Sequence, residues 1–299
     1  MRIVEKLVGK NLAPYALTVA FALIAILAWA VATMQPRLDA KKFTTDELEL
    51  MEFNGDVVRD EAGNYAYNPA KARGLPGPDD VWRKGVTEFS EAFVKKGTND
   101  HGIGFLVIYT LQRFFTGFLA ASVIAILLGV VIGLSPMLYT ALNPIIQLLK
   151  PISPLAWMPL LLYSVKDPFW TAILVVFMAS LWPTVANTAF GVSTIRKDYL
   201  RVAAMIEMGF ARRLFGVILP GAAPAIFAGL RISFGSALVA VVPAEMLLGE
   251  LGIGYLSWIE WNNLDVAGVI FAICVVGLVG VVLDTAFTLL AAKFTYAEG

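Results

Sequence analysis

Few side chains of this protein could take part in chemistry by themselves. The chain has one cysteine, Cys274, and one histidine, His101, so it can form neither a disulfide framework nor a Cys/His metal cluster. The nucleotide-binding pattern G-x-x-x-x-G-K-[ST] does not occur, because Gly9-Lys10 is followed by Asn11 and lacks the upstream glycine. We therefore predict no catalytic residue, metal or cofactor in this chain. If ATP is used, a separate subunit binds it.

The composition indicates a membrane protein. Of the 299 residues, 58% are hydrophobic and 15% are charged, against about 45–50% and about 25% in soluble domains. Half of the charged residues lie between Arg37 and Asp100, so the rest of the chain carries little charge. Acidic and basic residues are equal in number, which leaves no basic excess for neutralising nucleic-acid phosphates.

Long uncharged runs predict six membrane-spanning helices. The first covers residues 12–34, which are enough to cross about 30 Å of hydrocarbon. A cleaved signal peptide is the alternative for this run, since Ala30-Val31-Ala32 has the form of a cleavage site. The other five spans are expected near residues 105–133, 138–164, 169–190, 222–244 and 266–290.

The third of these six spans is expected to be broken. Pro151, Pro154 and Pro159 remove backbone donors and bend helices. Such a break survives at membrane depth where it faces protein or a water-filled cavity.

Residues 35–101 are predicted to form an insertion outside the membrane. Valines and tyrosines flank the turn EAGN at 61–64, which predicts a β-hairpin. A helix follows the segment PGP at 76–78, and its apolar face either packs on its own domain or lies on the membrane surface. The four hairpin residues and the four residues of that face are Val57, Val58, Tyr65, Tyr67, Trp82, Val86, Phe89 and Phe93.

The charges of the connecting segments predict their sides of the membrane. Residues 191–220 carry five basic side chains and are expected in the cytoplasm, whereas residues 245–265 carry only acidic ones and are expected outside. Six spans then place both termini in the cytoplasm. The predicted divisions are 1–34 (N-terminus and first span), 35–101 (insertion) and 102–299 (core with five spans and the loop 191–220).

The basic segment KDYLRVAAMIEMGFARRLFGVILP at 197–220 could contact another protein. It predicts a short helix with Ala203 and Ala204, then Gly209, then a second helical turn that stops before Pro220. Small residues let another backbone approach closely, and the arginines offer charged contacts. An amphipathic helix lying on the inner leaflet is an equally good interpretation.

This segment, followed by APAIFAGLRI at 223–232, resembles the EAA loop of ABC-importer permeases and the helix after it. The resemblance is nearest to the nitrate, nitrite, cyanate and bicarbonate branch, with the sulfonate and taurine permeases next. Supporting stretches are LPGPDDVW at 75–82, TLQRFFTGF at 110–118, LNP at 142–144, PLAWMP at 154–159, AEML at 244–247 and GIGY at 252–255.

The EAA signature is degenerate in this chain, and two alignments are possible. Counting back from Pro220 puts Arg201 at the family's Glu, Ala203 at its second Ala and Glu207 at its Gly. Aligning on Gly209 instead puts Ala203 at the Glu. The residues that would couple to the ATPase are Asp198, Arg201, Ala203, Ala204, Glu207, Gly209, Arg212 and Arg213.

The resemblance implies an all-α membrane protein with the type I importer (MetI-like) fold, in the bacterial inner membrane. It implies a homodimer driven by two ATPase subunits, which hold ATP and Mg²⁺, and fed by an extracytoplasmic solute-binding protein. The expected substrate is a small anion, with nitrate or nitrite favoured. The alternatives are a sulfonate or taurine permease and, in another class, a membrane anchor or sensor presenting residues 35–101.

Polar residues near the spans are candidates for the translocation path. Arg231 would either attract an anion or pair with Asp284, and the pairing is the favoured interpretation. Arg113 and Lys150 are expected to snorkel near span ends, with positive charge in the path as the alternative for Lys150. Glu250 and Glu245 are expected in the outer loop. The path candidates are Ser153, Trp157, Asn187, Arg231 and Glu245.

Overall fold

The computed structural model describes residues 13–33, 43–59, 65–67 and 75–294. These residues are almost entirely helical, as the composition predicted. The chain divides into two compact units, 1–86 and 87–299. The predicted basic N-terminus and the turn at 61–64 lie outside the described residues.

The first unit contains an apolar helix where the first span is predicted, and the hairpin. Helix α2 (Ala13–Ala32) is apolar throughout, and α3 (Thr45–Phe53) begins with a capping box between Thr44 and Glu47. Strands β1 (Val57–Arg59) and β2 (Tyr65–Tyr67) pair antiparallel, with Val57 opposite Tyr67. The predicted hairpin is therefore confirmed in its strands.

Helix α4 (Pro78–Ser90) follows the PGP segment as predicted, and the boundary between the units falls within it. Val81 and Gly85 are its buried residues, while Trp82, Val86 and Phe89 are exposed. Phe93 lies beyond the end of the helix. The Phe89 ring also meets the Phe271 ring edge to face, with centroids 5.7 Å apart, so this face is partly packed on the protein and partly exposed.

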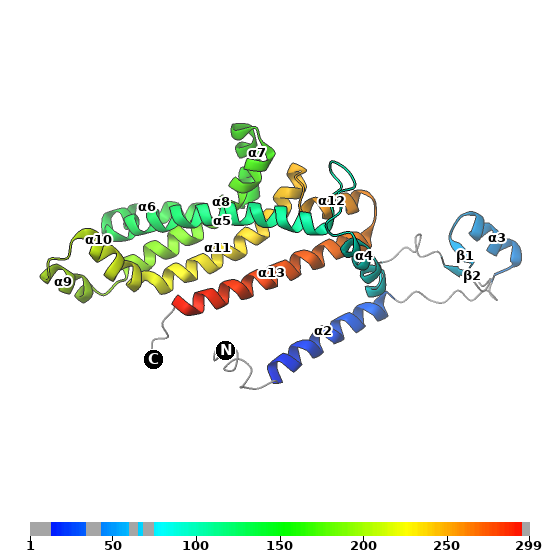
Figure 1. Cartoon of the computed structure of the whole chain (residues 1–299), viewed down its shortest axis with the longest axis horizontal. Coiled ribbons are helices and arrows are strands. Elements are labelled where there is room, and N and C mark those ends of the chain that lie inside the picture. The colour runs from blue at the N-terminus through cyan, green and yellow to red at the C-terminus, as the bar shows by residue number, and fades with distance from the viewer. Residues whose placement is uncertain (1–12, 34–42, 60–64, 68–74, 295–299) are drawn as a thin grey trace. The chain divides into compact units, whose positions relative to one another are not determined.

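The second unit is a bundle of long helices. Its elements are α5 (Ile103–Leu134), α6 (Pro136–Leu149), α7 (Pro154–Val165), α8 (Pro168–Ser193), α9 (Lys197–Met205), α10 (Phe210–Arg213), the π-helix η2 (Leu214–Ile218), α11 (Leu219–Leu248), α12 (Ile253–Asn262) and α13 (Val266–Phe294). Helix α8 lies at its centre, because both α5 and α11 pack along it (Figure 1). The segment predicted as an outer loop, 245–265, is partly helical, since it contains α12.

Within the described residues, four helices are long and apolar enough to cross a membrane: α5, α8, the continuous run through α10 and α11, and α13. Helices α6 and α7 pass the same criterion together, but they are bent by 93° at a short break. The predicted break is confirmed at residues 150–153. It does not extend to Pro159, which lies inside α7.

Close contact between α5 and α8 depends on glycine. A Cβ atom on Gly117 would lie 2.7 Å from the Ile173 carbonyl oxygen, and one on Gly129 would lie 2.5 Å from Thr188 Cβ. Small residues at such positions let two membrane helices approach backbone to backbone.

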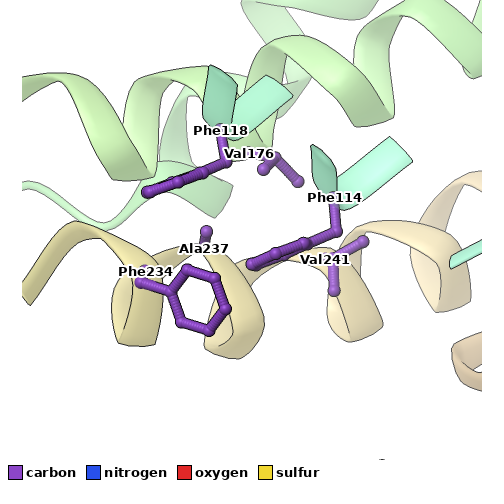
Figure 2. Close-up of a cluster of buried hydrophobic side chains, with 6 residues drawn as sticks. All are labelled: Phe114, Phe118, Val176, Phe234, Ala237 and Val241. Carbon is purple, nitrogen blue, oxygen red and sulfur yellow. The ribbon is translucent and has the colours of Figure 1, made fainter. Parts of the chain in front are cut away.

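Aromatic side chains fill the space between α5 and α11. The Phe234 ring of α11 meets Phe114 and Phe118 of α5 edge to face, with ring centroids 4.9 and 5.3 Å apart (Figure 2). Val176 of α8 and Ala237 and Val241 of α11 complete this cluster. Edge-to-face geometry places the positive ring edge on a negative ring face.

Polar groups join α8 to α11 inside the bundle. Ser233 Oγ donates to the Ser180 carbonyl oxygen at 2.6 Å, so Thr184 Oγ1 must be the donor in its 2.7 Å contact with Ser233 Oγ. All three residues are buried. Their hydrogen bonds fix how the two helices are aligned along their axes.

Candidate functional site

The basic segment after α8 forms two short helices and a tight reversal. Helix α9 ends at Met205, and the Met208 N–H donates to the Ala203 carbonyl oxygen at 3.0 Å. Helix α10 then begins at Phe210. Ala203 is buried and Ala204 is exposed, so the two alanines point to different sides of α9.

The helix does not end before Pro220, which corrects the prediction. Proline has no backbone N–H and clashes with the carbonyl four residues earlier, but it fits in the first turn of a helix. Here the π-helix η2 carries the chain into α11, and the Leu219 N–H donates to the Leu214 carbonyl oxygen. The wider turn accommodates Pro220 without ending the helix.

The reversal after α9 is made by a residue in the left-handed conformation. Glu207 has φ of 49°, a value that favours glycine and strains other residues. Gly209 has φ of −59°, and a Cβ atom there would meet nothing within 4 Å. The backbone conformation therefore favours glycine at the position of Glu207, whereas the position of Gly209 does not require it. That agrees with the alignment that places Glu207 at the family's Gly.

Apolar side chains cover the outer surface of this segment. Met205 is 81% exposed, and four neighbouring apolar side chains are more than half exposed. Arginines border them, and Asp198 forms long ion pairs of 3.6 Å with Arg196 and Arg201. Contiguous exposed apolar side chains edged by charge mark an interaction surface. The other four are Tyr199, Val202, Ile206 and Phe210.

The two ends of the bundle differ in character. Helices α9 and α10 lie at one end, whereas α12 lies at the other, beside the start of α5 (Figure 1). Glu245 and Glu250 precede α12 and Glu260 lies in it, whereas the α9–α10 end carries arginines.

A buried ion-pair network lies at the α12 end. Arg113 Nη1 donates to Glu245 Oε1 at 2.9 Å, and Arg113 Nη2 donates to Glu250 Oε2 at 2.7 Å. Thr110 Oγ1 and the Gly254 N–H donate to the other oxygen of Glu245 at 2.9 and 3.1 Å. The Glu245 carboxylate thus has donors from α5 and from the start of α12.

This network corrects two predictions. The Arg113 side chain is 4% exposed and does not snorkel, and the Glu245 side chain is 0% exposed and is not part of an outer loop surface. The cause is tertiary: each charge is neutralised by a partner on another helix, which makes its burial tolerable. Three stretches that carried the family resemblance, at 110–118, 244–247 and 252–255, meet in this one network.

The path candidates do not come together in one place. Ser153 and Arg231 line one cavity with a volume of about 650 Å³. Asn187 donates to the Pro183 carbonyl oxygen at 2.8 Å inside α8, and Trp157 is half-buried on α7. Glu245 belongs to the ion-pair network. Neither Asn187 nor Trp157 is among the described residues that line the cavity.

Lys150, for which snorkelling and a place in the path were both considered, lines this cavity together with Arg231 and Asp284. Arg231 Nη2 lies 3.9 Å from Asp284 Oδ2, so the expected pairing of these two residues is present.

The bundle, its bent helix pair and its two dissimilar ends define an all-α, multi-pass membrane permease. Residues 121–296 match the family described as the binding-protein-dependent transport system inner membrane component. The chain belongs to this family. Membership implies ATPase and substrate-binding protein partners, and it favours a transport subunit over an anchor or an enzyme.

Curated relatives agree with this assignment. The chain is 37% identical over 224 residues to the nitrate import permease protein NrtB of Synechocystis sp., covering 75% of this chain and 82% of the relative. It is 36% identical over 221 residues to the bicarbonate transport system permease protein CmpB of Synechococcus elongatus, covering 73% and 80%. The taurine transport system permease protein TauC of Escherichia coli is 30% identical over 190 residues, covering 64% and 69%. The predicted resemblance and its order of branches are confirmed.

Proposed function

We propose that this protein is the permease subunit of an ATP-driven importer for a small anion, with nitrate or nitrite favoured. Six spans serve this role: α2, α5, the bent pair α6–α7, α8, the run through α10 and α11, and α13. Two copies form the channel. A solute-binding protein delivers the anion outside, and two ATPase subunits holding ATP and Mg²⁺ bind inside.

The exposed apolar surface of residues 198–213 is the observation that carries this proposal. A permease without nucleotide-binding residues must receive mechanical work through contact with another subunit. Met205 and its exposed apolar neighbours supply contact area, and Arg201 and Arg212 supply charged contacts at the edge. The continuous helix from η2 into α11 transmits movement of this segment to the interior of the bundle.

The left-handed backbone at Glu207 supports the alignment counted back from Pro220. In this alignment Arg201 occupies the position of the family's Glu. The side chain that reaches the ATPase therefore carries a positive charge in this protein. The ATPase groove is expected to present a carboxylate to it.

The sidedness follows from charge and from the positions of the helices. The arginine-rich α9–α10 end suits the cytoplasm under the positive-inside rule. Helix α12 lies at the opposite end of the bundle (Figure 1), which suits contact with the solute-binding protein outside. An even number of spans then places both termini in the cytoplasm.

The relatives named for nitrate and bicarbonate transport support a small, singly charged oxyanion as substrate. A sulfonate or taurine permease is the second candidate, supported by the lower identity to the taurine permease.

Reconstitution tests both parts of the proposal. The permease is co-expressed with its ATPase and binding protein, and uptake of ¹⁵N-nitrate, ¹³C-bicarbonate and taurine into proteoliposomes is measured with and without ATP. We expect ATP-dependent nitrate uptake, which taurine does not inhibit. If the proteoliposomes take up taurine but not nitrate or bicarbonate, the protein is a sulfonate or taurine permease instead.

A charge placed on the apolar surface tests the coupling role. Met205→Glu is expected to lower ATPase copurification and ATP-driven uptake by at least about tenfold, because a desolvated charge opposes burial in the ATPase groove. Phe53→Glu is the matched control, since Phe53 is an exposed apolar residue on α3. If Met205→Glu keeps its ATPase but loses binding to anionic vesicles, the segment lies on the membrane instead.

A further inference from the structure

The bend between α6 and α7 creates a cavity against the bundle, here called the α6–α7 cavity. Its volume is about 650 Å³, and its walls come from the bend and from α8, α11 and α13. Its charged or donor-bearing lining residues include Lys150, Ser153, Trp182, Arg231 and Asp284. Irregular backbone at membrane depth is tolerated where it lines such a space.

The charges of this cavity do not balance. Lys150 and Arg231 are positive and Asp284 is negative, so the lining residues carry one excess positive charge. Within the part of the chain that the structure describes, Lys150 has no ion-pair partner. The 3.9 Å separation of Arg231 Nη2 from Asp284 Oδ2 is too long for a hydrogen bond. Arg231 and Asp284 are 60% and 55% exposed, and Lys150 is exposed, so these charges are accessible to a monovalent anion that enters the cavity.

A neutral donor also lines the same space. Ser153 is the N-cap of α7 but makes no capping hydrogen bond, so its hydroxyl is free of that role. The first residues of α7, Pro154 and Leu155, also line the cavity. The positive end of the α7 dipole therefore adds to the attraction for an anion.

We propose that the α6–α7 cavity binds a small, singly charged oxyanion as it crosses the permease. Arg231 and Lys150 neutralise its charge, while the Ser153 hydroxyl donates to its oxygens. This inference rests on the proposed function and adds a binding site in the permease itself. It gives Arg231 both roles considered from the sequence, because the residue pairs loosely with Asp284 and still faces the anion.

Asp284 keeps this site weak. Its carboxylate competes for Arg231 and repels an anion, so the site can release what it binds. A transport site must bind well enough to admit its ion and weakly enough to let it leave.

The test uses the reconstituted complex of permease, ATPase and binding protein, with ¹⁵N-nitrate uptake as the readout at saturating binding protein. Arg231→Gln and Lys150→Gln are each expected to lower the maximal uptake rate by about tenfold or more, because each removes a charge-assisted hydrogen bond. Arg231→Lys is expected to retain most of the rate. Lys166→Gln is the control, since Lys166 is an exposed cation at the end of α7 that does not line the cavity.

A second readout separates binding from folding. Isothermal titration of the permease–ATPase complex with sodium nitrate, without binding protein, is expected to detect weak binding. Asp284→Asn is expected to strengthen it while slowing uptake. Basal ATP hydrolysis, gel filtration and membrane yield report whether each variant assembles.

The outcomes are distinguishable from failure of the proposed function. If the wild-type complex transports none of the anions tested, the importer assignment fails first. If the wild type transports nitrate and the Arg231→Gln and Lys150→Gln variants both equal the Lys166→Gln control, the cavity is not an anion site. Two further salts identify the ion that binds. Titration with sodium sulfate changes the anion, and titration with tetramethylammonium nitrate changes the cation, so the binding heat should persist only with the second salt. Heat that follows the cation would overturn the proposal.

Discussion

Arg113 Nη1 of α5 lies 2.9 Å from Glu245 Oε1 of α11, and both side chains are buried. The same Arg113 nitrogen donates to the Leu251 carbonyl oxygen at 2.7 Å, just before α12 begins. One guanidinium thus joins two long helices to the segment that leads into α12. This arrangement orders the end of the bundle opposite α9 and α10.

Removing one partner of this pair is expected to be severe. Arg113→Leu leaves the Glu245 carboxylate buried without its charge partner, at a cost of about 3–5 kcal/mol. The measurement is the thermal unfolding of the detergent-solubilised complex. The double variant Arg113→Leu with Glu245→Gln is expected to recover part of the loss, since glutamine keeps an acceptor for Thr110 without the charge. Equal stability of single variant and wild type would show that the pair does not support the fold.

The glycine before α12 is required by the same network. A Cβ atom on Gly252 would lie 2.2 Å from Glu245 Oε2, so Gly252→Ala must displace the carboxylate. We expect a loss of stability of about 1–3 kcal/mol, typical of overpacking a buried site. Gly277→Ala in α13 is the control, because nothing lies within 4 Å of a Cβ there. It should be neutral or mildly stabilising. The prediction fails if the two alanine variants unfold at the same temperature.

Two substitutions of Glu207, the residue with left-handed backbone after α9, are expected to have opposite effects. Glu207→Gly is expected to preserve ATP-driven uptake and to relieve strain of about 1 kcal/mol, since glycine adopts positive φ freely. Glu207→Val is expected to lower uptake, because a β-branched residue resists this conformation. Uptake and ATPase stimulation in proteoliposomes provide the comparison. Loss of uptake in the glycine variant would mean that the Glu207 carboxylate itself is needed.

Sidedness is testable with single cysteines on a Cys274→Ala background, since Cys274 is exposed. Trp261 on α12 and Met205 at the end of α9 are both exposed. In intact cells a membrane-impermeant maleimide is expected to label Trp261→Cys. It should label Met205→Cys only after permeabilisation. Labelling of Met205→Cys from outside would reverse the proposed orientation and remove the coupling role.

Much of the fold was predictable because its signals are local. Uncharged runs located α5, α8 and α13 within a few residues, and alternating apolar residues around a turn located β1 and β2. The prolines located the break between α6 and α7. The family itself was recognisable from short stretches, since each of these is a local pattern of residue types.

Other features depend on which helix faces which, and local patterns do not contain this. Arg113 and Glu245 are separated by 132 residues, so their pairing follows only from the alignment of α5 with α11. Pro220 predicts a helix end, and only the π-turn before it shows how the helix continues. One alignment was based on Gly209 because it is a glycine, whereas the backbone angle shows that Glu207 is the strained residue.

The sequence by itself determined that the chain is a membrane protein that resembles importer permeases and carries a basic segment at 197–220, because hydrophobic length, charge bias and motif spacing are properties of consecutive residues. Only the tertiary structure decided that Arg113 and Glu245 neutralise each other and that Lys150 and Arg231 share one cavity. The physical reason is that a buried charge is acceptable or costly according to its neighbours in space. Those neighbours are set by how helices from distant parts of the chain fit together.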